Sequence, residues 1–106
     1  MLTVIFSGAT LVPANAAPVY LFPVAECAVD YARAHHDYAA TDILTKAGCK
    51  FIAPIDGVVD EVNRTDLWSG KTNLGIDRGG LYVSIIGTDG VRYYGSNLRS
   101  IPSSIQ

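Results

Sequence analysis

The chain has 106 residues, of which 49% are hydrophobic and 17% are charged. This composition excludes a disordered polymer, and the length allows one domain with a single core. The formal net charge is −2 and no run of Lys or Arg occurs, which excludes the basic footprint of a nucleic-acid-binding protein. The scattered basic residues also argue against an electrostatic membrane patch.

The first sixteen residues have the composition of an export signal. Residues 2–12 are apolar, but this run is shorter than the roughly 20 residues that span a bilayer, so no stable membrane span is expected. Ala14-Asn15-Ala16 has the small-x-small form of a signal-peptidase site. We therefore predict a signal-peptide remnant at residues 1–16, a domain at residues 17–106, and secretion. Because no Lys or Arg precedes the apolar run, a buried strand is the alternative for residues 1–16.

Residues 19–24 form a short apolar stretch that contains Pro23. Proline cannot donate to a β-ladder, so the stretch predicts an edge strand or an extended arm. Cys27 and Cys49 follow. In an exported chain they are expected to form a disulfide, which would stabilise the fold by about 3 kcal/mol. Two reduced, buried thiols are the alternative, and the spacing fits no Cys-x-x-Cys motif.

Alternating and β-branched residues predict strands in the rest of the chain. The final two predicted strands flank a Thr-Asp-Gly turn and form the clearest hairpin. Gly57 and Gly90 are expected to occupy turns with positive φ. The predicted strands cover residues 49–54, 58–62, 81–86 and 91–95.

Between the second and third of these strands, residues 63–80 are rich in Gly, Asn, Asp, Ser and Thr and contain Trp68. A loop of this length is often functional. No segment shows sustained helical periodicity. The sequence therefore predicts an all-β fold, in which an antiparallel sheet folds toward a sandwich.

Three local patterns occur in a fixed order. They are HHDYAATDI at residues 35–43, GCKFIAPIDGVV at 48–59, and GGLYVSII at 79–86 with DGVRYYGSNL at 89–98. Each is weak alone, and the second also occurs in biotinyl and lipoyl domains. Together, over about residues 24–101, they resemble the lysostaphin/LytM-like zinc metallopeptidase family, closest to its secreted actinobacterial type. The carrier-domain reading is set aside because the hairpin turn at residues 87–90 lacks the Lys that such domains need.

The resemblance implies a β-sheet or sandwich of the duplicated hybrid motif type and a zinc endopeptidase that cleaves peptidoglycan peptide bonds at the cell wall. It assigns His36 and Asp42 as zinc ligands, with His35 in reserve for His36. Zinc accepts imidazole and carboxylate ligands, and a turn can bring two side chains six positions apart together. Asp37 is a second carboxylate in the segment. Two histidines beside acidic residues are, without the resemblance, often only a solvated turn.

Two departures from the family pattern bear on activity. Asn97 stands where the family has a histidine, and Asn cannot carry charge or move a proton. The family's His-x-His element, which supplies the third zinc ligand, does not occur in these 106 residues. We therefore expect a metallopeptidase-like domain that is incomplete at the C-terminus and weak or inactive. A non-catalytic relative that binds cell-wall peptide or regulates a partner, and a truncated product without function, are the alternatives. Trp68 and Tyr94 are the candidate walls of a substrate groove.

Overall fold

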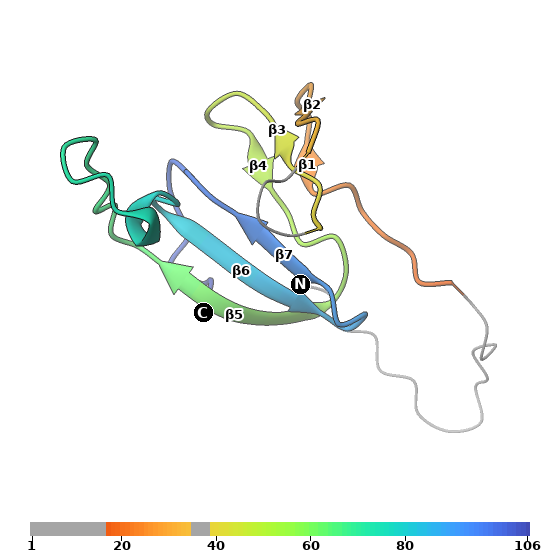
Figure 1. The fold of residues 1–106 in the computed structure, drawn as a ribbon. Coiled ribbons are helices and arrows are strands. Elements are labelled where there is room, and N and C mark those ends of the chain that lie inside the picture. The colour runs from red at the N-terminus through yellow and green to blue at the C-terminus, as the bar shows by residue number, and fades with distance from the viewer. Residues whose placement is uncertain (1–16, 35–38) are drawn as a thin grey trace.

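The computed structural model describes residues 17–34 and 39–106. Its main element is a three-stranded antiparallel sheet in the order β5-β6-β7 (Figure 1). This sheet consists of β5 (Gly57–Asn63), β6 (Tyr82–Gly87) and β7 (Arg92–Gly95). These three strands confirm the predictions for residues 58–62, 81–86 and 91–95. The predicted signal remnant at residues 1–16 lies outside the described residues.

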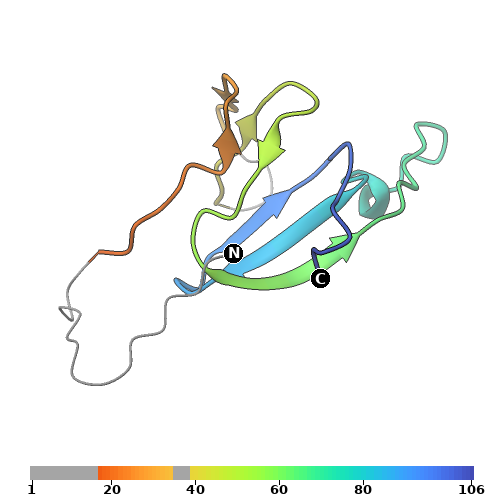
Figure 2. The same ribbon diagram turned by 180° about the vertical axis from the view of Figure 1, so that it is seen from behind.

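The N-terminal part of the chain forms two small ladders beside this sheet (Figures 1 and 2). β1 (Val24–Ala25) pairs with β4 (Lys50–Phe51), and β2 (Asp30–Tyr31) pairs with β3 (Ile43–Leu44), both antiparallel. Ladders of two residues per strand are not stable by themselves. A disulfide between Cys27 and Cys49, with Cα atoms 6.1 Å apart, links the residues after β1 to the residue before β4. It confirms the predicted pairing.

Residues 17–23 run as an extended arm before β1. The Leu21 N–H donates to the carbonyl of Pro54 at 2.8 Å, and the Ile52 N–H donates to the carbonyl of Pro23 at 2.9 Å. These two bonds attach the arm to the segment after β4. Of the two predictions for residues 19–24, the arm is therefore correct for most of the stretch, and strand pairing begins only at Val24.

The core lies on one face of the three-stranded sheet. Val83 and Ile85 of β6 are 6% and 7% exposed and are the buried hydrophobic side chains of the described residues. The ring of Phe51, from β4, lies against the main chain of Gly95 in β7. β4 therefore covers part of this face, as one layer of a sandwich covers another.

The all-β prediction is confirmed, because the described residues contain antiparallel strands and one 3-10 turn, η1 (Gly75–Asp77), in the long loop. The duplicated hybrid motif stays a prediction. Within residues 17–34 and 39–106, no helix has the length and apolar character needed to cross a membrane. Gly90 has a φ of +79°, as predicted. Gly57 does not have a positive φ, so the prediction that it occupies such a turn is wrong.

Candidate functional site

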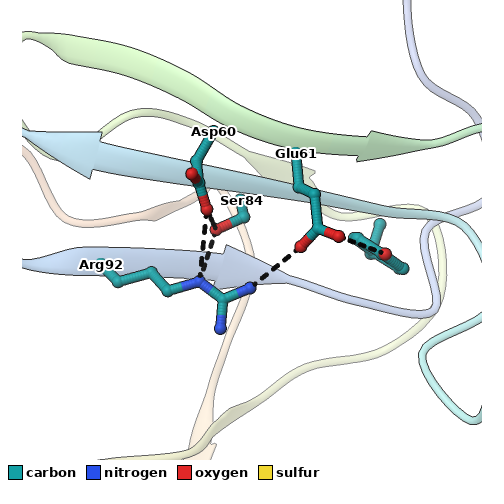
Figure 3. Close-up of polar contacts among 5 residues, drawn as sticks. Asp60, Glu61, Ser84 and Arg92 are labelled. Atoms are coloured by element: carbon teal, nitrogen blue, oxygen red, sulfur yellow. Dashed lines mark hydrogen bonds and ion pairs between the residues drawn. The ribbon is translucent and has the colours of Figure 1, made fainter. Parts of the chain in front are cut away.

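A β-bulge in β5 places two consecutive acidic side chains on the same face of the sheet, opposite the face that carries Val83 and Ile85. In a regular strand, successive side chains point to opposite faces. The pairing with β6 shifts register between Val59 and Glu61. A bulge of this kind re-aims side chains, and here Asp60 and Glu61 both reach the face that carries Ser84 and Arg92 (Figure 3).

Ser84 lies at the centre of these contacts and is fully buried, with 0% exposure. The Arg92 Nε–H donates to Ser84 Oγ at 2.7 Å, and the Ser84 hydroxyl donates to Asp60 Oδ2 at 3.3 Å. Arg92 Nη2 lies 3.4 Å from Glu61 Oε2. The charged side chains of Arg92, Asp60 and Glu61 are about half exposed, so their ion pairs add little to stability. Their charged ends remain accessible to a ligand.

Two tyrosines extend this arrangement. The Tyr82 hydroxyl donates to Glu61 Oε1 at 3.2 Å, and the Tyr82 and Tyr94 ring centroids are 5.3 Å apart. The Arg92 guanidinium carbon lies 5.2 Å from the Tyr94 centroid, within range of a cation–π interaction. Desolvation and the bond to Glu61 raise the pKa of Tyr82, which keeps its hydroxyl a donor. We call these side chains the sheet-face cluster: Asp60, Glu61, Tyr82, Ser84, Arg92 and Tyr94.

The sheet-face cluster presents charged, polar and aromatic groups on one face of the sheet. It offers carboxylate acceptors, a guanidinium donor and the half-exposed ring of Tyr94. The Ser84 hydroxyl does not have the setting of a serine–histidine nucleophile, because it is buried and bonded to Asp60 and Arg92. The residues that the structure describes include no imidazole to serve as its base. The cluster can therefore recognise charged and aromatic groups.

The predicted zinc ligands are placed only in part. His36 and its reserve, His35, lie outside the described residues. Asp42 immediately precedes β3 and is partly buried, and its main-chain carbonyl accepts a bond from the Ala32 N–H at 3.1 Å. Within residues 17–34 and 39–106, no three His, Cys, Asp or Glu side chains form a group that could hold a metal ion. The imidazole and carboxylate donors suit zinc chemically, and the site stays a prediction.

Asn97, predicted to stand where the resembled family has a histidine, lies in a bend just after β7. Its φ is +53°, a left-handed conformation that Asn adopts more readily than most residues. Its N–H donates to the Gly79 carbonyl at 2.7 Å, and its side-chain oxygen lies beside Gly80. The backbone conformation and these contacts account for Asn97 by a structural role.

The two predicted groove residues come from different elements. Tyr94 is part of the sheet-face cluster and 45% exposed. Trp68 is 42% exposed on the loop between β5 and β6, where its main-chain N–H donates to Asp66 Oδ1 at 2.9 Å. Both rings are therefore accessible, and their joint role as groove walls stays a prediction.

Five members of the sheet-face cluster were not predicted from the sequence: Asp60, Glu61, Tyr82, Ser84 and Arg92. The available signal was the adjacent acidic pair inside a strand of β-branched residues, which breaks the strict alternation of a half-buried strand. A break of this kind is compatible with a bulge, but it does not say which residues of the neighbouring strands lie opposite.

No protein-family model, curated protein or solved structure matches the chain. The resemblance to LytM-like peptidases therefore depends on the three sequence patterns alone.

Proposed function

We propose that the chain is a secreted, LytM-like domain that binds peptidoglycan peptide and carries a partial zinc site, with weak or absent hydrolysis by itself. The observation that supports this most is the sheet-face cluster. Cell-wall peptides carry free carboxylate and amino groups, which are complementary to a guanidinium beside carboxylates. Tyr94 adds a half-exposed aromatic surface beside those charges.

Zinc belongs to this proposal through His36 and Asp42, with His35 as the alternative imidazole. When bound, zinc would supply Lewis-acid polarisation of a peptide carbonyl. Catalytic zinc sites use three protein ligands, so one imidazole and one carboxylate hold the metal weakly. The Cys27–Cys49 disulfide closes the segment of the chain to which both residues belong in sequence.

A non-catalytic cell-wall-binding role is the second candidate, and the geometry of Asn97 favours it. At this position the family uses a histidine that stabilises the transition state, whereas Asn97 has a left-handed backbone conformation and contacts Gly79 and Gly80. Loss of one such donor costs about two to three powers of ten in rate. A domain with this substitution can still bind the same peptides.

Binding is tested by sedimentation of the protein with purified peptidoglycan. We expect the wild type to sediment and Arg92→Gln to bind about tenfold more weakly, because it loses a charge-assisted contact. The control is Arg33→Gln, an exposed arginine outside the three-stranded sheet, which should bind like the wild type. Failure of the wild type to sediment would overturn the binding proposal.

The zinc site is tested separately by equilibrium dialysis. Asp42→Asn should reduce zinc uptake, whereas Asp30→Asn, in the neighbouring strand β2, should not. Digestion of peptidoglycan by the purified chain alone, abolished by a chelator and restored by zinc, would contradict weak or absent hydrolysis.

A further inference from the structure

The loop between β5 and β6, residues 64–81, projects beyond the end of the sheet (Figures 1 and 2). Its large apolar side chains are exposed. Leu67 is 63% exposed and Trp68 42%, just before the turn at the tip, while Leu74 and Ile76 are 53% and 87% exposed just after it. Apolar side chains gathered on one projecting loop mark an interaction site more often than single exposed ones do.

Hydrogen bonds among the polar groups of the loop hold it together. The Asn63 side-chain amide donates to the carbonyls of Thr65 and Gly80 at 2.9 and 2.7 Å. Asp66 accepts the bond from Trp68 described above, and the Asn73 N–H closes the tip turn on the Ser69 carbonyl at 2.8 Å. The polar groups of the loop thus bond to one another, while its large apolar side chains face solvent.

The charges of the loop differ in sign from those of the whole chain. Residues 64–80 contain three basic and two acidic side chains, whereas the chain has a net charge of −2. Asp66 is exposed and lies beside Gly80, and Lys71 lies in the exposed tip turn. An anionic surface would therefore attract this end of the molecule first.

We propose that this loop is a peripheral anchor for an anionic lipid surface. Leu67, Trp68 and Ile76 enter the headgroup region, where Trp is favoured, and Lys71 contacts the anionic headgroups. The scattered basic residues of the sequence argued against an electrostatic patch. The structure offers apolar side chains with one cation at the tip instead, which is the combination that interfacial binding needs.

The chain has one tryptophan, so its fluorescence reports on this loop alone. We expect vesicles of mixed phosphatidylglycerol and phosphatidylcholine to shift the emission to shorter wavelength, and pure phosphatidylcholine to do so far less. The double variant Leu67→Ser/Ile76→Ser should bind at least tenfold more weakly, because it loses two of the apolar side chains that enter the headgroup region. Lys71→Gln should lower the affinity about fivefold.

The matched control is Val58→Ser, which changes a 66% exposed apolar residue of β5 outside the loop and should leave vesicle binding unchanged. Absence of a shift with any vesicle, or full binding by the double variant, would overturn the proposal. So would equal binding to both kinds of vesicle. An emission shift with lipid-free peptidoglycan and none with vesicles would instead assign Trp68 to the substrate groove. Peptidoglycan sedimentation of the double variant tests the proposed function independently.

Discussion

At the scale of single residues, the close approach of β5 and β6 depends on Gly57. A Cβ at this position would collide with the main-chain carbonyl of Ile86, which cannot rotate away as a side chain would. We expect Gly57→Ala to lower the free energy of unfolding by about 1–3 kcal/mol, as overpacking does. Gly70→Ala is the control, because nothing lies within 4 Å of its Cβ position. Urea denaturation should separate the two variants, and equal stabilities would contradict the close approach.

The hydrogen bonds of the Asp89 carboxylate, in the hairpin turn, predict how the stability of the fold varies with pH. It accepts bonds from the hydroxyls of Tyr93 at 2.6 Å and Tyr20 at 3.0 Å, and from the Val91 N–H at 3.0 Å. The bond from Tyr93, followed by that from Val91, lowers the pKa of Asp89. The same bond to Asp89, followed by desolvation, raises the pKa of Tyr93 to about 12.

The signs of these shifts define two pH ranges. The lowered pKa of Asp89 stabilises the fold above the carboxyl's ordinary value of 3.8, and this stability is lost as the pH falls through that value toward the folded-state pKa. The raised pKa of Tyr93 stabilises the fold below pH 10.0, and this stability is lost as the pH rises to about 12. Tyr93→Phe should weaken both dependences in urea titrations followed by circular dichroism. Tyr31→Phe, an exposed tyrosine in β2, should keep them.

At the scale of elements, the two small ladders depend on the disulfide. Each pairs only two residues per strand, and the cysteines close a segment with a sequence separation of 22. In the chain-entropy model, such a crosslink contributes about 3 kcal/mol. We expect Cys27→Ser/Cys49→Ser to lose hydrogen-exchange protection in β1 to β4 while β6 keeps most of its protection. Unchanged exchange in β1 to β4 would mean that packing alone holds these ladders.

The same elements show how far the sequence could predict the fold. The hairpin of β6 and β7 was predictable, because alternation and a Thr-Asp-Gly turn act locally. The disulfide was predictable from the inferred export. Residues 49–54 also alternate, yet only Lys50–Phe51 forms a strand. The residues that follow include Pro54, which cannot donate to a ladder, and they bond to the extended arm instead. The sheet-face cluster was not predictable, since its members come from three strands whose register depends on a bulge.

At the scale of the whole molecule, stability depends on a thin core on one face of one sheet. The other face carries the sheet-face cluster, so among the described residues the buried apolar side chains are Val83 and Ile85. Domains of about this size bury a smaller fraction of their surface than larger ones and are marginally stable.

Two identical substitutions on opposite faces therefore should have unequal effects. Val83→Ala removes buried methyl groups from a side chain that is 6% exposed, and we expect it to cost about 2 kcal/mol. Val58→Ala changes a side chain that is 66% exposed, and its effect should stay within about 0.5 kcal/mol. Chemical denaturation measures both. Equal costs would mean that the face with Val58 is also covered in solution, and the sheet-face cluster would then not be open to a cell-wall peptide.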